Sequence, residues 1–217
     1  MTKTLAIIGG TGNQGPGLAR RWAMSGQYTV IIGSRQADKA ERIAAELNAQ
    51  IGQDLLIGLA NEDAAQAADI SILTVPYTAQ APTLVSLRDS LQGKILVDVT
   101  VPLKPPKVAR VNIPIGLSAA QESQTLLGEG VRVVSAFQNI SAAHLADEHE
   151  IDCDVLICGD DKAAKQEVIA LAEAVGLRGI DAGPLQNAVA AEALTSILIG
   201  INIRYKVKGS GIKITGL

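Results

Sequence analysis

The sequence predicts an α/β protein built on a doubly wound parallel sheet, and two observations lead to that prediction. Short apolar runs of strand length alternate with segments in which apolar residues recur at helical spacing. Most of these runs are apolar on both faces, which is typical of parallel strands covered by helices on each side. The chain has 217 residues, 47% of them hydrophobic, which suffices for one full core and a small appended unit.

Strands and helices alternate up to about residue 136. We expect strands at residues 4–9, 28–33, 55–59, 69–76, 94–99 and 131–136. We expect helices at residues 13–25, 37–49, 61–68, 78–91 and 119–127, with Asn61 as an N-cap. Residues 101–114 contain four of the eight prolines and predict a long loop before the last of these helices.

An acidic, irregular stretch at residues 146–154 indicates a boundary between a main domain at 1–150 and a small C-terminal α/β domain at 151–217. The small domain has expected strands at residues 155–158 and 177–181, an expected helix at 161–175, and a long final helix from Leu185 to about Val207. The final helix is apolar around most of its surface. We therefore expect it to be buried on several sides and to contribute to a homodimer interface.

Charge and hydropathy argue against several broad classes of protein. The net charge of −3 and the pI near 5.4 disfavour general binding to nucleic acid or to a membrane surface. We find no signal-peptide pattern, and the apolar stretches fall short of the roughly 20 residues that span a bilayer, so we expect a cytoplasmic protein. Cys153 and Cys158 flank one expected strand on opposite faces and are expected to be core residues.

A glycine-rich motif lies between the first expected strand and the first expected helix. Its pattern, Gly-x-Gly-x-x-Gly, marks at this position the dinucleotide-binding turn of a Rossmann-like fold. Gly10 permits the tight turn, Gly12 lets the backbone approach a pyrophosphate, and Gly15 lets the helix pack on the strand. The free N–H groups of the helix N-terminus then bind the phosphates. The expected contact residues are Gly10, Thr11, Gly12, Asn13, Gln14 and Gly15.

The end of the second expected strand predicts NADP rather than NAD as the dinucleotide. NAD-selective proteins place an Asp or Glu there to bind the ribose 2′-hydroxyl. Here Gly33 is followed by Ser34 and Arg35, which offer a hydroxyl and a fork of N–H donors to a 2′-phosphate. Lys39, four residues after Arg35 and on the same helix face, adds a second positive charge.

We find no motif for a catalytic acid–base pair, a nucleophile or a metal site in the sequence. Tyr28, Tyr77 and Tyr205 all lack a lysine four residues later, which excludes the acid–base pair of the short-chain dehydrogenases. His144 and His149 lie in an acidic segment and are expected at a solvated helix end rather than on a metal. Hydride transfer between two bound cofactors needs no protein acid, only donor and acceptor carbons held face to face.

Further short motifs accompany the glycine loop and the residues Ser34, Arg35 and Lys39. They are Leu73-Thr74-Val75-Pro76, Val134-Ser135-Ala136, Cys158-Gly159-Asp160-Asp161, Asp181-Ala182-Gly183-Pro184-Leu185, Arg204-Tyr205-Lys206 and Gly211-Ile212-Lys213-Ile214-Thr215-Gly216-Leu217. Together these motifs resemble the coenzyme F420-dependent NADP oxidoreductases, over nearly the whole chain. The turn at residues 181–185 and the C-terminal run are the most specific parts of the resemblance.

The resemblance implies that NADP(H) and the deazaflavin coenzyme F420 are bound face to face and exchange a hydride. It implies that the glycine loop, Ser34, Arg35 and Lys39 hold NADP. The deazaflavin is expected in a cleft between the carboxyl edge of the sheet and the small domain. The residues implied to border the nicotinamide are Val75, Pro76, Val101 and Ala142, and those implied to line the deazaflavin include Gln138 and Ile212.

The chain departs from some members of that family at two positions. Some members have a His and a Pro in the segment that here reads Phe137-Gln138-Asn139-Ile140-Ser141, where Gln138 can hydrogen-bond the deazaflavin but cannot supply a proton. Tyr77, next to Pro76, replaces a Trp of some members. Basic residues that suit the phosphate and polyglutamate tail of F420 gather in two stretches of this acidic protein. They are Lys104, Lys107, Arg110, Arg204, Lys206, Lys208 and Lys213.

Two other functions fit the same sequence less completely. Related Rossmann-like proteins with a long C-terminal helix are NADPH-dependent reductases of a small imine, ketone or metal chelate. The run from Gly10 to Gly15 also resembles non-catalytic NADP-sensing regulators of the nitrogen-regulator type. The specific turn at residues 181–185 argues against that last class.

Overall fold

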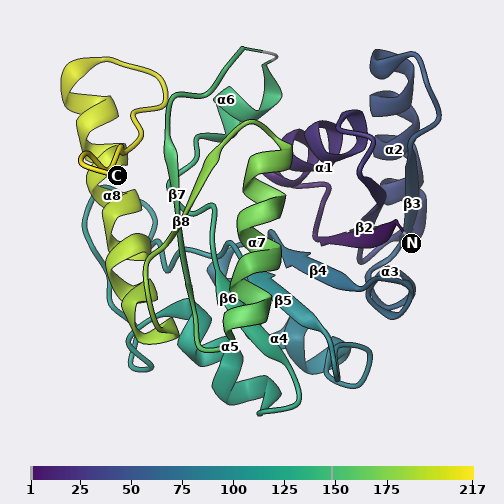
Figure 1. Cartoon of the computed structure of the whole chain (residues 1–217), viewed down its shortest axis with the longest axis horizontal. Helices are drawn as coiled ribbons and strands as arrows, with labels where there is room; N and C mark the ends of the chain where they lie inside the picture. The colour runs from purple at the N-terminus through teal and green to yellow at the C-terminus, as the bar shows by residue number, and fades with distance from the viewer. Residues whose placement is uncertain (1, 148) are drawn as a thin grey trace.

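The structure, a computed structural model that describes residues 2–147 and 149–217, has the doubly wound α/β fold that the sequence predicts (Figure 1). The described residues form one sheet with the strand order β3-β2-β1-β4-β5-β6-β7-β8. The order reverses between β1 and β4, and ligands bind at the carboxyl ends of the strands at such a switch point. The strands are β1 (Lys3–Ile8), β2 (Tyr28–Ser34), β3 (Leu56–Ala60), β4 (Ile70–Leu73), β5 (Ile95–Asp98), β6 (Arg132–Ser135), β7 (Asp154–Gly159) and β8 (Arg178–Asp181).

The helices agree with the expected segments to within a few residues at most ends. They are α1 (Gly15–Met24), α2 (Ala37–Ile51), α3 (Asn61–Ala67), α4 (Tyr77–Leu87), α5 (Ala119–Leu127), α6 (Ala142–Ala146), α7 (Lys162–Ala174) and α8 (Ala188–Tyr205). A short 3-10 turn, η1 (Leu185–Asn187), precedes α8, and α6 was not predicted. The prediction of Asn61 as an N-cap is wrong, because Asn61 is the first residue of α3 and Ala60 is the N-cap.

Two hydrophobic cores fill the two faces of the sheet. One core lies under α1, α2 and α7, and the other lies under α3, α4 and α5. Trp22 of α1 is fully buried in the first core, where its indole N–H donates to the carbonyl of Leu171 in α7 at 2.8 Å. Cys153 and Cys158 belong to opposite cores, as the strand spacing predicts, and both are free thiols in the part of the chain described here.

The sheet continues past the predicted parallel strands into β7, which runs antiparallel to β6. The strands from β1 to β6 are parallel, as predicted. After β6 the chain stays at the carboxyl edge, forms only the short α6, and enters β7 from that same edge, which reverses its direction. The first residues of β7 and of its parallel neighbour β8 therefore lie at the carboxyl edge of the sheet. The domain boundary near residue 150 stays a prediction.

Helix α8 lies at one end of the molecule and is only partly covered (Figure 1). Ile197 and Ile203 are 49% and 66% exposed. The segment Leu185–Tyr205 is long and apolar enough, by length and composition alone, to cross a membrane, which corrects the expectation that no stretch reaches that length. Core helices of soluble proteins pass the same test, so this finding is weak evidence for a membrane.

Glu192 is a buried carboxyl group within this apolar helix, and it links α8 to α5. Its oxygens accept hydrogen bonds from the N–H groups of Ala119 and Ala120, the first residues of α5, at 2.7 and 3.1 Å. Burial raises the pKa of Glu192 to about 8, because the charged form loses its hydration in the interior.

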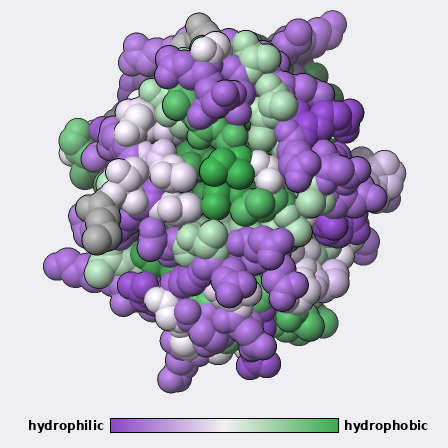
Figure 2. All heavy atoms as spheres, turned by 90° about the vertical axis from the view of Figure 1, so that its right-hand side faces the viewer, coloured by the Kyte–Doolittle hydropathy of each residue, from purple (hydrophilic) through white to green (hydrophobic). Residues whose placement is uncertain are grey.

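The opposite end of the sheet finishes at the edge strand β3. Figure 2 shows the molecule from the side on which α2 and β3 lie in Figure 1, and hydrophobic residues gather near its centre among hydrophilic ones. Ile57 of β3 is 51% exposed. Because β3 has only five residues, its free edge is short, and short edge strands limit edge-to-edge association.

Candidate functional site

The carboxyl ends of β1, β2 and β4 surround a cavity of about 510 Å³ at the switch point of the sheet. The cavity brings together seven of the residues predicted to contact a ligand. These are Thr11, Gly12, Ser34, Arg35, Lys39, Val75 and Pro76. Other described residues line it without having been predicted as contacts, namely Gly9, Gln36, Asn61, Thr74, Ala79 and Thr83.

The glycine loop after β1 is crowded on its inner side. Gly9 has a φ of +69°, so Gly9 makes the left-handed turn that was expected at Gly10. A Cβ at Gly10 would lie 2.7 Å from the carbonyl oxygen of Ile7. The N–H of Gly10 donates to the carbonyls of Ile7 and Gly33 at 3.0 and 2.8 Å. Backbone contacts with β1 and β2 thus hold the loop in place.

Gly12 and Gly15 are required for different reasons. A Cβ at Gly15 would lie 2.5 Å from the Cα of Gly10, so α1 begins in direct backbone contact with the loop, as predicted. A Cβ at Gly12 would meet no described atom closer than 3.5 Å. Gly12 is exposed and lines the cavity. The absence of a side chain at Gly12 therefore serves the approach of a ligand rather than the packing of the protein.

Helix α1 begins with a positive end that the described side chains leave uncapped. Gln14 is the N-cap residue, and its amide donates instead to the carbonyls of Phe137 and Ile140 at 3.0 and 3.3 Å. The first turn contains no acidic residue, so the helix dipole is not neutralised there. Such a terminus suits a phosphate group. Asn13 is exposed in the loop that leads to it.

Arg35 and Lys39 place two positive charges on one wall of the cavity. Both side chains are exposed, one just after β2 and the other in the first turn of α2. Ser34 is buried at the end of β2, and its hydroxyl oxygen accepts the N–H of Gln36 at 3.3 Å. None of the described residues that line the cavity is an Asp or a Glu. This donor set fits the 2′-phosphate of NADP and offers no carboxylate to a free ribose hydroxyl.

Asn61 contributes to the site, although its sequence position predicted only a helix cap. Its side-chain oxygen accepts the N–H of Gly9 at 3.1 Å. The same oxygen would lie 2.8 Å from a Cβ at Gly33. Asn61 therefore lies between the ends of β1 and β2 and holds the first glycine of the loop at the cavity wall. The sequence did contain a signal for this role, because Asn61 is a polar residue directly after the third strand, at the edge where ligands bind.

Three other predicted residues lie along the same edge, outside this cavity. Val101 follows β5, and Ala142 begins α6 after β6. The carbonyl of Ile212 accepts the N–H of Asp154, the first residue of β7, at 2.8 Å. The strand order therefore places Val101 and Ile212 further along the carboxyl edge than the cavity. Ala142 begins α6, which packs against α1 where Leu145 meets Gly17.

Gln138 differs from the expectation that it faces a ligand. The residue is 5% exposed. Its amide nitrogen donates to the backbone carbonyl of Asp98 at 2.7 Å and to the hydroxyl of Ser135 at 2.8 Å. The side chain is thus directed into the interior between β5 and β6. A glutamine so close to the end of a buried strand finds its partners inside the protein, because a buried amide must be hydrogen-bonded.

Tyr77 begins α4 beside the cavity, and its hydroxyl donates to a carboxylate oxygen of Glu122 at 2.7 Å. Burial and this hydrogen bond raise the pKa of Tyr77 to about 12. The other oxygen of Glu122 accepts the N–H of Gly116 at 3.3 Å. Tyr77 therefore keeps its proton at neutral pH and, through Glu122, connects the turn beside the cavity to the long loop before α5.

The geometry of the glycine loop predicts opposite outcomes for two alanine substitutions. Gly12→Ala should leave thermal stability unchanged, because its Cβ has room, but should weaken NADPH binding about tenfold or more by blocking the backbone approach. Gly15→Ala should lower the melting temperature, because its Cβ meets backbone. Thermal unfolding and a fluorescence titration with NADPH measure the two effects. Equal loss of stability in both variants would contradict these roles.

Comparison with known proteins agrees with these features. Residues 4–102 match the family model described as NADP oxidoreductase, coenzyme F420-dependent. The F420-dependent NADP reductase of Methanocaldococcus jannaschii is 46% identical over 222 aligned residues, which cover 98% of each chain. A crystal structure assigned to the F420-dependent NADP reductases, from Arthrobacter sp. FB24, superposes with a TM-score of 0.80 over 99% of both chains, at 26% identity.

A further relative is similar to this chain over part of its own length. The metalloreductase STEAP3 of Rattus norvegicus is 32% identical over 186 residues, which are 85% of this chain but 35% of the metalloreductase. The agreement with the Methanocaldococcus jannaschii enzyme, by contrast, extends over both chains from end to end. The chain therefore belongs to the family of F420-dependent NADP reductases, which are NADP-dependent oxidoreductases.

Proposed function

We propose that this chain transfers a hydride between NADP(H) and the deazaflavin coenzyme F420, with both cofactors bound along the carboxyl edge of the sheet. The observation that carries the proposal is the cavity itself. It combines an open glycine loop with the cationic wall formed by Arg35 and Lys39. Membership of the F420-dependent NADP reductases supports F420 as the second cofactor.

In this proposal the glycine loop and the uncapped N-terminus of α1 hold the pyrophosphate of NADP. The contacts run from Gly10 to Gly15. Ser34, Arg35 and Lys39 hold the 2′-phosphate through charge-assisted hydrogen bonds. The turn at Val75 and Pro76 borders the nicotinamide, because it lines the cavity after β4.

The second cofactor is proposed to lie further along the same edge. Val101 and Ala142 follow β5 and β6, so they stand between the NADP cavity and the end of the sheet. Ile212, whose carbonyl bonds to the first residue of β7, supplies a wall on the far side. We assign Gln138 a supporting place only, because its amide is committed to the interior.

The reaction that these cofactors supply is the movement of one hydride from one ring to the other. The protein's proposed contribution is to bind both rings, to orient them and to exclude water, which needs no proton transfer from a side chain. Tyr77 fits this scheme, because its hydroxyl is already committed to Glu122 and its pKa lies far above neutral. The side chains at the edge act by position rather than as acids or bases.

The acidic tail of F420 is proposed to lie beside the long loop after β5. Lys104, Lys107 and Arg110 are exposed on that loop. The basic cluster near the C-terminus offers fewer uncompensated charges than the sequence indicates, because Lys213 forms an ion pair with Asp152. The remaining exposed basic residues there are Arg204, Lys206 and Lys208.

A second candidate function is the NADPH-dependent reduction of a metal chelate. The observation that favours it is the similarity of most of this chain to part of a protein named as a metalloreductase. The metalloreductase is far longer than this chain, whereas the F420-dependent relative agrees with it in length. The F420 reaction is therefore the better supported of the two.

We also propose that two copies of the chain associate through α8. Ile197 and Ile203 are exposed on this helix, and the loop that passes Gly200 adds the exposed Ile113 and Ile115. Exposed apolar side chains on a helix and on the loop beside it are typical of an interface. A dimer of this kind would cover the exposed apolar residues of α8 without a membrane. We therefore still propose a cytoplasmic protein with neither membrane nor nucleic-acid partners.

Light scattering after size-exclusion chromatography tests the association. The wild-type protein should have the mass of a dimer. Ile203→Lys should shift it to the mass of a monomer, because association would bury the charged lysine side chain without a partner. Ile57→Lys, which adds the same charge to the exposed edge strand β3, is the matched control and should remain a dimer. A monomeric wild-type protein would exclude the proposal.

Mixing the protein with NADPH and oxidised F420 tests the reaction directly. The visible absorbance of oxidised F420 should bleach while an equal amount of NADPH is consumed, because each hydride leaves one cofactor and enters the other. Consumption of NADPH with an imine, a ketone or a metal chelate, but not with F420, would instead support the alternative reductases. Tight NADP binding without turnover of any of these substrates would support a non-catalytic NADP-sensing regulator.

Exchanging the residues after β2 tests the proposed 2′-phosphate site. The double variant Ser34→Asp with Arg35→Ala should lose about 10- to 100-fold in affinity for NADPH and gain preference for NADH, because it removes a cation and adds a carboxylate. Arg42→Ala, which changes an exposed cation of α2 outside the cavity, is the control. Unchanged preference for NADPH in the double variant would refute this site.

A further inference from the structure

The chain turns back after α8 and lies against the start of β7. Lys206 has a left-handed φ of +56° and reverses the chain direction. The carbonyl of Gly209 then meets the Nε2 atom of His144 in α6 at 2.7 Å. A Cβ at Gly211 would lie 2.5 Å from the Sγ atom of Cys153, so the backbone passes directly over that thiol. We call residues 209–214 the C-terminal strap.

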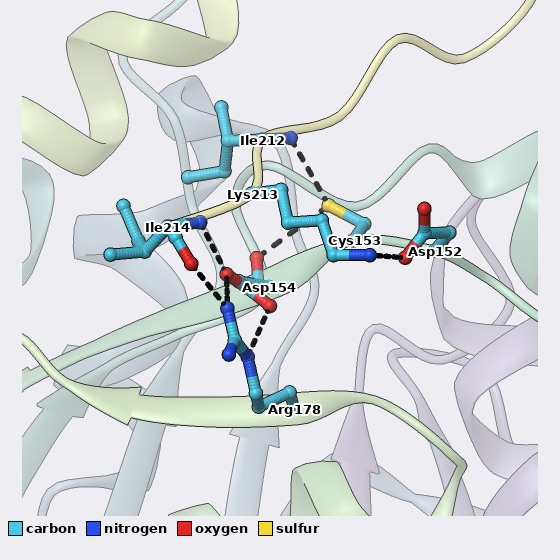
Figure 3. A network of polar contacts seen from close by, with 7 residues as sticks. All are labelled: Asp152, Cys153, Asp154, Arg178, Ile212, Lys213 and Ile214. Carbon is cyan, nitrogen blue, oxygen red and sulfur yellow. Dashed lines mark hydrogen bonds and ion pairs between the residues drawn. The ribbon is translucent and has the colours of Figure 1, made fainter. Parts of the chain in front are cut away.

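An ion pair between Asp154 and Arg178 holds the end of this strap (Figure 3). The two residues face each other across β7 and β8. The Nε and Nη2 atoms of Arg178 donate to the two carboxylate oxygens of Asp154 at 2.8 and 2.5 Å. Nη2 also donates to the carbonyl of Ile214 at 2.6 Å, and the N–H of Ile214 donates to Asp154 at 2.6 Å. We call this pair the clasp.

The clasp does more for the strap than for the sheet. Asp154 is only 2% exposed, whereas Arg178 is exposed. An ion pair with an exposed partner contributes little to the stability of a fold. The hydrogen bonds from Arg178 hold the pKa of Asp154 below its usual value, so the pair stays ionised at neutral pH. Both charged groups bond to the backbone of Ile214. Their arrangement therefore fixes where the strap lies.

Ile212 lies between the clasp and the Cys153 thiol. Its N–H donates to the Sγ atom of Cys153 at 3.4 Å, and its carbonyl accepts the N–H of Asp154 at 2.8 Å. Figure 3 shows Ile212 and Ile214 side by side on the strap, with Arg178 reaching up from β8 to Asp154. A change in the clasp therefore displaces Ile212.

We propose that Asp154 and Arg178 are positioning residues for the deazaflavin, because their ion pair fixes the strap and with it the wall that Ile212 presents to the second cofactor. This inference rests on the proposed function. The clasp and the NADP cavity share none of their described residues, and different strands carry them. Loss of the clasp therefore affects F420 and leaves NADPH binding intact.

Arg178→Gln removes the positive charge and the bidentate contact. We expect the KM for F420 to rise about tenfold, while the KM and the affinity for NADPH change by less than about twofold. Hydrogen–deuterium exchange of the peptide that contains the strap should become faster. Arg178→Lys should give an intermediate KM for F420, because an ammonium keeps the charge but lacks the fork, and it serves where the glutamine variant does not fold.

The matched control is Lys165→Gln. It removes the ion pair of 2.7 Å between Lys165 and Asp181, at the opposite end of the same strand β8. This variant should lower the melting temperature but leave the KM for F420 and the exchange of the strap unchanged. A control that raises the KM for F420 as much as the arginine variants do would show that any weakening of β8 has this effect, and the inference would fall.

The remaining outcomes separate the inference from the proposed function. Wild-type enzyme that reduces F420, with an unchanged KM for F420 in both arginine variants, overturns only the role of the clasp. Faster exchange of the strap with no change in F420 affinity does the same, because the strap then forms no wall of the site. Wild-type enzyme that neither binds nor reduces F420 removes the proposed function and this inference together.

Discussion

The contact between the glycine loop and the start of α1 is the constraint on which the rest of the site depends. Gly15 lies so close to Gly10 that not even one carbon atom fits between them, and this fixes the first turn of α1 at the end of β1. From there Gln14 reaches the turn after β6, at the carbonyls of Phe137 and Ile140. The end of the helix that is proposed to bind the pyrophosphate is thereby joined to the edge where the second cofactor is proposed to lie.

The far end of α1 makes a second connection to the same region. The guanidinium of Arg21 donates to the carbonyls of His144 and Leu145 in α6, at 3.0 and 3.1 Å. Helix α1 is therefore tied to α6 and to the turn before it at both of its ends. Because Ala142 begins α6, its distance from the glycine loop is set by one rigid helix. Hydride transfer needs that kind of fixed separation between two binding sites.

The parts of the site that the sequence predicts are those made by neighbours along the chain. The glycine loop and the residues Ser34, Arg35 and Lys39 are local motifs that follow two strands, and strand alternation alone brings their ends together at the switch point. The contacts of Asn61 and Gln138 could not be predicted, because their partners are distant in sequence. Asn61 bonds to Gly9, and Gln138 bonds to Asp98, 40 residues earlier. The alternation of apolar residues likewise carries no information on strand direction, so the antiparallel pairing of β7 with β6 could not be predicted.

The NADP cavity and the proposed second site are built from different parts of the chain. Sequence similarity over one part of the chain therefore supports only the site that this part forms. The NADP cavity is complete within the first 83 residues, inside the segment that matches the family model at 4–102. The proposed second site uses Ala142 and the strap at 209–214, which lie beyond that segment and meet through long-range contacts such as the Asp154–Arg178 pair. A match over the first segment therefore covers the residues of the NADP cavity but not those of the proposed second site. Support for F420 at that second site therefore comes from relatives that agree along the whole chain, where the residues that hold the strap are compared as well.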